Sequence, residues 1–207
     1  MSWFSRSQAE PCPPPASSSH RSLALGPLLS GLHPESRHAV LDLGPPMGHN
    51  LELLAALGCR IRITDLFRSL ASETLEAREP QACRALFERL LPLDVGERFD
   101  AVLMWDLFDY LRLHEAAALM ARITPACAPR AVIFGLVSTL HQIPATPLRY
   151  RIDDRETLYS TGPREPQRPA PRHTQPELVR RMPGFKVKAS YILRHGVQEY
   201  LFERAPS

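Results

Sequence analysis

The feature that most constrains the fold is a short apolar run leading into a turn with two glycines and two prolines. Residues 40–50 read VLDLGPPMGHN. Residues 39–43 are apolar except for Asp42, which is typical of a strand buried in a parallel sheet. Leu51 and Leu54 then fall on one face of a helix. A buried strand, a glycine-containing turn and an amphipathic helix, in this order, predict an α/β unit that binds a cofactor.

Pro45 and Pro46 limit what this turn can bind, because proline has no N–H. The pyrophosphate of a dinucleotide is held by N–H groups of such a turn and of the following helix. A dinucleotide fingerprint would also need glycine at positions 46 and 49, where Pro46 and His49 stand. Residues before proline favour extended backbone, so we expect the helix to begin after Met47. A cofactor without phosphate fits this turn better than a nicotinamide or flavin dinucleotide does.

Further segments continue the alternation of strands and helices. Residues 60–64 predict a second strand, which ends in Asp65. Residues 99–106 predict a buried strand ending in an acid, and residues 131–137 predict another. Residues 116–123 repeat with helical spacing between these two strands. Strands that alternate with helices indicate a parallel sheet with right-handed crossovers.

The rest of the domain is less regular. A helix is predicted from about residue 69 to 78, closed by Pro80, and residues 81–93 suit either a helix or an edge strand. Residues 185–191 and 197–202 alternate and are joined by a short turn, which predicts a hairpin. The sequence therefore predicts an α/β fold: a Rossmann-like, doubly wound, mostly parallel sheet of about seven strands that closes with an antiparallel C-terminal hairpin.

A chain of 207 residues is long enough for one core-bearing domain. Residues 1–22, rich in proline and serine, are expected to be a disordered tail, and residues 23–205 to be a single domain. Residues 139–174 form an insertion rich in proline and arginine. Within it, residues 149–159 predict a small hairpin, and residues 162–173 are expected to be unstructured.

Composition excludes several classes of function. No apolar run approaches the roughly 20 residues of a membrane-spanning helix, so we expect no membrane association. The four cysteines include no Cys-x-x-Cys pair, which argues against a metal site or a disulfide framework and favours a cytoplasmic location. Arginine far outnumbers lysine, which indicates a GC-rich, bacterial genome. Basic residues are thinly spread, so nucleic acid is not an expected partner.

At this point the residues resemble the class I S-adenosylmethionine-dependent methyltransferases. In that family the first strand carries an acid two places before a Gly-x-Gly-x-Gly turn. Asp42 holds the place of the acid, Gly44 and Gly48 hold the outer glycines, and Pro46 replaces the central one. The acid that ends the family's second strand and binds the ribose matches Asp65. The resemblance extends to about residue 204, including the strand that ends near the transferred methyl group and the closing hairpin.

The resemblance implies S-adenosylmethionine as cofactor and methyl transfer as activity. It implies a backbone seat for the cofactor at Gly44, Pro46 and Gly48, with Asp42 near the methionine end. Further cofactor and substrate roles are implied for Asp65 on the ribose, Asp106 at the methyl end, and Asp109 and His141 on the acceptor side. No catalytic base and no metal ligand stand out.

Each of these residues also has a structural interpretation. Asp65 can cap the next helix, and Asp42 can accept a hydrogen bond from its own turn. Asp106 and Asp109 can be caps at a strand end, and a loop histidine such as His141 is usually solvated. Two other functions stay open: a methyltransferase-like binding or accessory protein without activity, and a nucleotide-binding oxidoreductase. The acceptor, a small molecule or a protein, and the oligomeric state are not fixed by the sequence.

Overall fold

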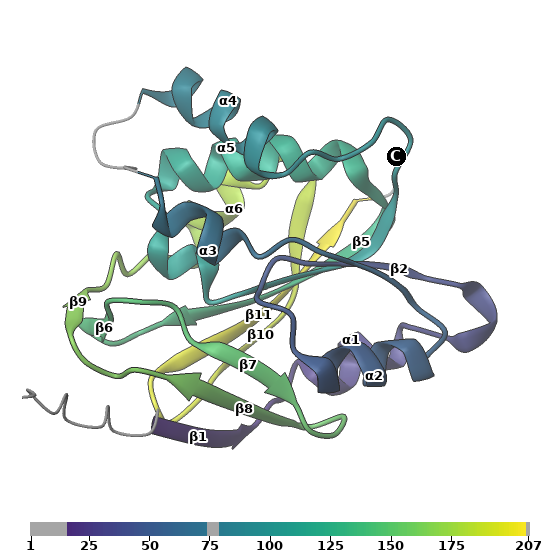
Figure 1. The fold of residues 1–207 in the computed structure, drawn as a ribbon, viewed down its shortest axis with the longest axis horizontal. Coiled ribbons are helices and arrows are strands. Elements are labelled where there is room, and N and C mark those ends of the chain that lie inside the picture. The colour runs from purple at the N-terminus through teal and green to yellow at the C-terminus, as the bar shows by residue number, and fades with distance from the viewer. Residues whose placement is uncertain (1–15, 74–78, 206–207) are drawn as a thin grey trace, which may run out of the picture.

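The structure, a computed structural model, describes residues 16–73 and 79–205. Its main sheet has six strands in the order β10-β11-β5-β4-β2-β3 (Figure 1). In chain order these strands are β2 (Ala39–Asp42), β3 (Arg60–Ile63), β4 (Phe99–Trp105), β5 (Cys127–Ser138), β10 (Phe185–Ile192) and β11 (Val197–Arg204). β3, β2, β4 and β5 are parallel, and β11 is antiparallel to both of its neighbours. The predicted α/β fold, mostly parallel and closed by an antiparallel hairpin, is confirmed.

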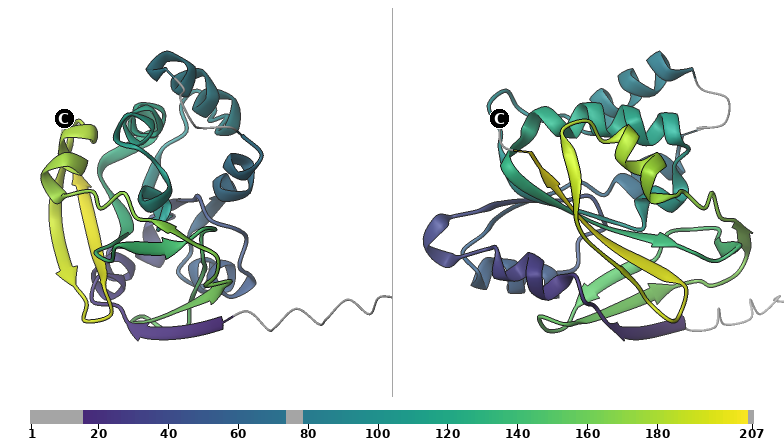
Figure 2. Two further views of the ribbon diagram at one scale, coloured as in Figure 1. Left: turned by 90° about the vertical axis from the view of Figure 1, so that its left-hand side faces the viewer. Right: turned by 180° about the vertical axis from the view of Figure 1, so that it is seen from behind.

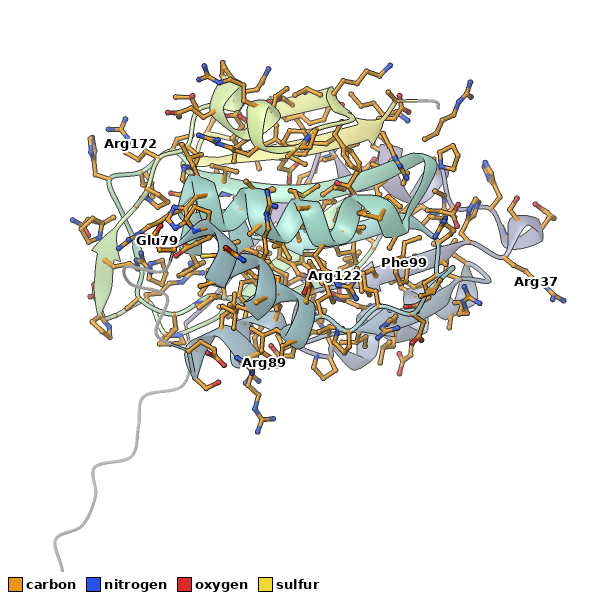
Figure 3. The ribbon with its side chains drawn as sticks, turned by 90° about the horizontal axis from the view of Figure 1, so that it is seen from above. Arg37, Glu79, Arg89, Phe99, Arg122 and Arg172 are labelled. Atoms are coloured by element: carbon orange, nitrogen blue, oxygen red, sulfur yellow. The ribbon has the colours of Figure 1, made fainter. Side chains whose placement is uncertain are left out.

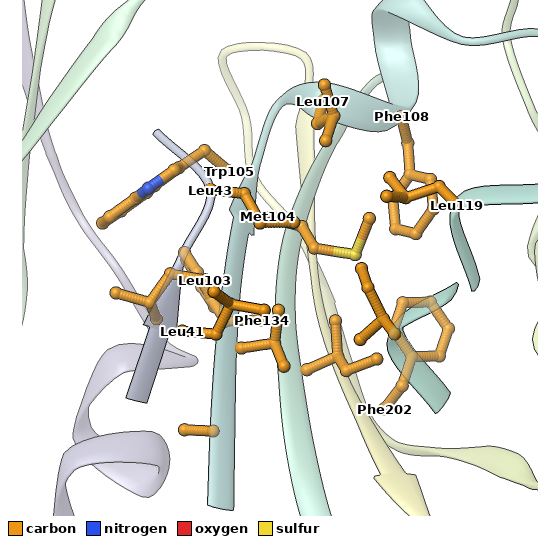
Figure 4. Close-up of a cluster of buried hydrophobic side chains, with 14 of the residues drawn as sticks. Leu41, Leu43, Leu103, Met104, Trp105, Leu107, Phe108, Leu119, Phe134 and Phe202 are labelled. Atoms are coloured by element: carbon orange, nitrogen blue, oxygen red, sulfur yellow. The ribbon is translucent and has the colours of Figure 1, made fainter. Parts of the chain in front are cut away.

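The central strands are apolar because both faces of the sheet are covered. Every residue of β2 is buried, and β4 is buried except for the half-buried Asp100. Consecutive side chains of a strand point to opposite faces, and Figure 4 shows Met104 and Trp105 on opposite sides of β4. A strand with two buried faces reads as a continuous apolar run, which is why these two were recognisable in the sequence.

Helices cover both faces of the sheet. The two on one face are α1 (Leu25–Ser30) and α2 (Gly48–Ala56), and the three on the other are α4 (Pro80–Leu90), α5 (Leu113–Ile123) and α6 (Gln175–Arg181) (Figures 1 and 2). The start of α2 at Gly48 agrees with the effect expected of the prolines. Arg122 of α5 donates to the carbonyls of Leu91 and Leu93, which joins α5 to the segment after α4 (Figure 3). Among the described helices, none has the length and apolar character needed to cross a membrane.

The sheet has six strands where the sequence predicted about seven. The ambiguous segment at residues 81–93 belongs largely to α4, so the third strand is absent from the described chain. Pro80, expected to close a helix, instead opens α4, because the first turn of a helix needs no N–H from that residue. The helix predicted at 69–78 is α3 (Leu66–Ala71), which begins earlier because Asp65 caps it, and residues 74–78 lie outside the described ones.

The insertion forms two small sheets at the edge where β2, β3, β4 and β5 end, here called the carboxyl edge. β6 (Gln142–Pro144) pairs with β9 (Gln167–Pro169), so part of the stretch expected to be unstructured is a short strand. β7 (Arg149–Ile152) pairs with β8 (Thr157–Gly162), which confirms the hairpin predicted there.

The N-terminal segment differs from the expected disordered tail. β1 (Ala16–Arg21) pairs antiparallel with β8, so the tail prediction is wrong for these residues, and residues 1–15 lie outside the described ones. Glu199 of β11, fully buried, accepts from the backbone N–H groups of Leu23 at 2.8 Å and Ala24 at 3.0 Å. Composition alone did not reveal these partners, because β8 and Glu199 lie more than a hundred residues away.

Candidate cofactor site at the carboxyl edge

The candidate site lies where the strand order reverses. From β2 the chain moves outward to β3, and it then returns to the other side of β2 as β4. Ligands of doubly wound sheets bind outside the carboxyl ends of the strands at such a point. Asp42 ends β2 and Asp106 follows β4, so two of the predicted site residues stand on the two sides of the reversal.

Asp42 is held by its own turn and by a tryptophan. Its Oδ1 accepts from the N–H of Gly44 at 2.9 Å and from Nε1 of Trp105 at 2.7 Å. Burial raises the pKa of the Asp42 carboxyl to about 6, although both hydrogen bonds act in the opposite direction. The structural interpretation of Asp42 therefore holds in this conformation, and its cofactor role stays a prediction.

The indole of Trp105 fills the space over Gly44. A Cβ on Gly44 would lie 2.6 Å from Cδ1 and 2.7 Å from Nε1 of Trp105, so only glycine fits against this ring. Trp105 has a φ of 51°, in the left-handed region that bulky residues rarely adopt. Pro46 and Gly48 lie at the surface, and a Cβ on Gly48 would meet nothing within 4 Å. Gly44 and Gly48 therefore occupy different surroundings.

A tyrosine of the insertion is stacked on Trp105. The rings of Trp105 and Tyr150 are stacked with centroids 5.5 Å apart and an interplanar angle of 5°. Tyr150 Oη donates to Oδ2 of Asp106 at 3.0 Å. Asn50 of α2 holds β7 from both sides, since its Nδ2 donates to the carbonyl of Tyr150 and its Oδ1 accepts from the N–H of Ile152. The turn, the end of β4 and the insertion thus form one bonded unit.

Asp106 and Asp109 form a second buried acidic group at the same edge. Asp109 accepts from the N–H of Ser138 with both carboxylate oxygens, at 3.1 and 2.9 Å, whereas Oδ1 of Asp106 is buried and has no hydrogen-bond partner among the described residues. Burial raises the pKa of Asp106 to about 7. Burial, together with the nearby charge of Asp106, raises the pKa of Asp109 to about 8. Both carboxyls can therefore carry a proton near neutral pH.

Asp65 and His141 lie differently from this buried group. Asp65 caps α3, with Oδ1 accepting from the N–H of Arg68 at 2.9 Å, and Oδ2 accepts no hydrogen bond from the described residues. It is half-buried and close enough to Asp42 to raise the pKa of that carboxyl slightly. His141 is exposed, with Nδ1 3.3 Å from a guanidinium nitrogen of Arg172. The structure brings Asp42, Asp65, Asp106 and Asp109 to one edge and leaves His141 outside this group.

A cavity of about 420 Å³ opens beside α3 at the carboxyl edge. It lies between α3, the 3-10 helix η2 (Leu107–Tyr110), the start of α5 and the insertion. The side chains around it are Phe67, Leu70, Ala71, Glu73, Leu107, Tyr110, Arg112, Glu115, Ala145, Thr146, Pro147 and Arg168. The wall is mostly apolar, with two arginines and two glutamates. Oε1 of Glu115 is buried, and no group within residues 16–73 and 79–205 forms a hydrogen bond with it.

Sequence reasoning missed the residues that close the site. Tyr150 was not singled out, and the sequence indicates only a helix cap for Asn50 and a place in the core or wall for Trp105, because their contacts join parts of the chain that are far apart in sequence. One signal was present: in the run from Arg149 to Ile152, alternation places Tyr150 and Ile152 on the same face, and both are buried. For metals, no group of three or more His, Cys, Asp or Glu side chains within residues 16–73 and 79–205 could hold an ion.

Comparison with known proteins gives partial likenesses in structure and none in sequence. No family profile and no curated protein sequence matches this chain. Among solved structures, the 1,6-didemethyltoxoflavin N1-methyltransferase of Burkholderia thailandensis, with bound S-adenosylhomocysteine, is 19% identical. That match covers 89% of this chain and 79% of the other, with a TM-score of 0.48.

Two further solved structures match to a similar extent. The glycopeptide N-methyltransferase MtfA, complexed with S-adenosylmethionine, is 15% identical over 88% of this chain and 93% of its own, with a TM-score of 0.48. An S-adenosylmethionine-dependent methyltransferase of Clostridium acetobutylicum is 10% identical over 81% and 84%, also with a TM-score of 0.48. At this degree of likeness, function has to be inferred from the residues of this chain.

Proposed function

We propose that this protein binds S-adenosylmethionine at the carboxyl edge and transfers its methyl group to a small-molecule or protein acceptor. The order of strands supports the proposal, with antiparallel β11 between β5 and β10. Acids at the ends of β2, β3 and β4 support it too, because they stand where the resemblance to class I methyltransferases requires them. A bacterial origin and a cytoplasmic location, expected from composition, belong to the same proposal.

The observation that carries the choice of cofactor is the absence of N–H donors in the turn. The N–H of Gly44 is taken by Asp42, and Pro45 and Pro46 have none. Three consecutive positions therefore offer no N–H to a ligand. A pyrophosphate depends on such donors, so the turn weighs against a nucleotide-binding oxidoreductase. S-adenosylmethionine has no phosphate, and the loss of these donors costs it less.

Asp65 and the cavity beside α3 suit the adenosine end of this cofactor. Oδ2 of Asp65 is available to accept from a ribose hydroxyl, and the helix that Asp65 caps contributes Phe67 and Leu70 to the cavity wall. When bound, the cofactor would supply its sulfonium methyl group. The chain would position the acceptor and exclude water, which the insertion over the carboxyl edge is placed to do.

Replacement of Asp65 tests the cofactor assignment. Two charge-assisted hydrogen bonds to the ribose contribute on the order of 2–3 kcal/mol. Asp65→Ala should therefore weaken binding of S-adenosylhomocysteine in calorimetry by roughly tenfold to a hundredfold, since about 1.4 kcal/mol is a factor of ten.

Asp65→Ser is the matched control for helix stability. Serine also caps helices, but it is too short to reach the ribose and lacks the charge. We expect Asp65→Ser to keep the thermal stability of the wild type while losing affinity as Asp65→Ala does. Unchanged affinity in both variants would remove Asp65 from the cofactor site.

A second candidate function is a methyltransferase-like protein that no longer catalyses. The contact between Trp105 and Gly44 favours it, because the indole lies where the turn would seat the methionine end. The two functions differ in turnover. Purified protein incubated with S-adenosylmethionine and a cell extract as acceptor source should release S-adenosylhomocysteine only if it is an enzyme, and a sample without the protein corrects for enzymes of the extract.

A further inference from the structure

We propose that Trp105 is a plug that the cofactor must displace: its indole occupies the space over Gly44, and hairpin β7–β8 holds it there. The inference rests on the proposed function, since it assumes that a ligand uses this turn. It goes beyond that function, because it assigns to two aromatic side chains control over access to the site.

The indole fits closely against the turn. The bare Cα of Gly44 lies so close to the ring that even a Cβ would collide with it, at 2.6 Å. Nε1 of Trp105 also donates to the Asp42 oxygen that binds the N–H of Gly44. With Trp105 only 2% exposed, no ligand reaches Gly44 in this conformation.

Residues of the insertion and of α2 hold the plug in place. Tyr150 is stacked on Trp105 and donates to Asp106, and the Asn50 side chain fixes the backbone of β7 on both sides of Arg151. The indole thus contacts both Gly44 and Tyr150. Its departure from the turn breaks the stack on Tyr150, so the contacts that hold β7 in place oppose the opening.

The backbone at Trp105 is strained. Its left-handed φ of 51° is unfavourable for a bulky side chain, and such conformations persist where their surroundings impose them, often at switch regions. The pairing of β4 with β5 shifts register between Leu103 and Trp105, which pairs with Gly135 at the end of β4. Trp105 therefore stands at an irregular end of the ladder, where a local movement breaks few regular pairs.

Tryptophan fluorescence follows the plug directly. The chain has two tryptophans, Trp3 and Trp105, so Trp3→Phe leaves one reporter. Titration with S-adenosylhomocysteine should shift its emission to the red and increase its quenching by acrylamide as the indole leaves its buried position. Calorimetry on the same sample records binding. Saturation without any change in emission or quenching would overturn the proposal.

Variants of Trp105 and Asn50 measure how much affinity the cofactor loses because it must displace the indole. Trp105→Ala removes the plug, and its affinity for S-adenosylhomocysteine should rise at least tenfold, or binding should appear where the wild type shows none. Trp105→Phe keeps a ring in place and should remain within a few-fold of the wild type. Because loss of a buried indole can unfold the chain, Asn50→Ala is a second variant that leaves Trp105 in place and releases β7. Its affinity should rise as well, and circular dichroism checks the fold of each variant.

The outcomes separate this proposal from the proposed function. If the wild type binds S-adenosylhomocysteine and the folded variants Trp105→Ala and Asn50→Ala bind it more weakly, then Trp105 is part of the wall of the cofactor site. This result overturns the plug but is consistent with methyl transfer. Binding only in the variants supports the plug and shows that the unaltered chain is not an active methyltransferase. Absence of binding in the wild type and in all folded variants overturns both.

Discussion

Acidic side chains at the two edges of the main sheet have pKa values shifted in opposite directions. At the edge where the parallel strands begin, here the amino edge, Glu203 lies 2.8 Å from Nζ of Lys188 and 3.6 Å from that of Lys186. The hydrogen bond from Lys188 lowers the pKa of Glu203. Burial alone would raise the pKa of Glu97, but hydrogen bonds from Arg62 and from the N–H of Asp94 lower it. These acids are charged, paired and partly solvated.

At the carboxyl edge the effect of burial on three acids exceeds that of the nearby arginines. Asp42, Asp106 and Asp109 are 6% exposed or less, and the charges of Arg164 and Arg168 lower the pKa of Asp106 and Asp109 only in part. Burial raises the pKa of all three. A chain gains no stability from such groups, so their concentration at one edge marks the place where function, rather than stability, sets the choice of residue.

The largest expected effect is on the pH dependence of stability. Between the ordinary pKa of an aspartate and the raised values of about 6, 7 and 8, the folded protein holds protons that the unfolded chain releases. The free energy of unfolding should therefore fall as pH rises from about 4 to 8. Urea unfolding from pH 5 to 8.5 measures this.

Asp106→Asn sharpens the same test. The amide keeps the shape and can still accept from Tyr150, but it has no charge to desolvate. Its stability should depend less on pH than that of the wild type. A wild type that becomes more stable toward pH 8 would show that the carboxyl edge does not dominate.

The next largest effect is expected at Asn50. Asn50→Ala leaves the carbonyl of Tyr150 and the N–H of Ile152 without their buried partner, and each unsatisfied group costs about 1–3 kcal/mol. We expect a loss of about 2–3 kcal/mol in chemical denaturation. His49→Ala is the control, because His49 bonds the carbonyl of Asp153 between the same two elements in an exposed position, and it should cost less than about 0.5 kcal/mol.

A smaller effect separates the two outer glycines of the turn. Gly44→Ala forces a Cβ against the Trp105 ring and should cost about 1–3 kcal/mol, as overpacking does. Gly48→Ala adds a Cβ in open space at the start of α2 and should change stability by less than about 0.5 kcal/mol. Equal thermal stabilities of the two variants would contradict the close contact at Gly44.

The smallest effect belongs to the amino edge. Glu203→Gln removes the attraction of two exposed lysines, and partly exposed ion pairs contribute about 0–1 kcal/mol. The loss should disappear at about 1 M salt, where charges are screened within about 3 Å. A loss larger than that of Asn50→Ala would reverse the contrast between the edges.

The sequence predicted those parts of the fold whose burial is continuous or strictly alternating. β2 and β4 are buried on both faces, and apolar and polar side chains alternate in the sequence of residues 185–191, so their patterns are local. α4 could not be separated from a strand, because a short amphipathic segment such as Gln81 to Leu90 satisfies both periods. β1 was missed because its serines carry no apolar signal and its partner strand is β8.

For the candidate site, the sequence predicted where the acidic residues lie but not which residues they contact. Asp42, Asp65 and Asp106 follow from the rule that ligands bind where parallel strands end, and the structure does bring them to one edge. What these acids contact could not be read from the chain, since the stack of Trp105 on Tyr150 and the bonds of Asn50 to β7 span 45 to 102 residues. Such contacts leave no periodic trace in the sequence.

The N-terminal strand β1 affects the order in which the parts of the fold form. β1 pairs with β8, and Ser18 bonds Ser160 across 142 residues. The segment after β1 is bound by Glu199, whose bonds span 175 and 176 residues. Contacts this distant in sequence form late and slowly. During synthesis, β1 therefore precedes its partners β8 and Glu199 by more than a hundred residues, and it stays unpaired until they have emerged.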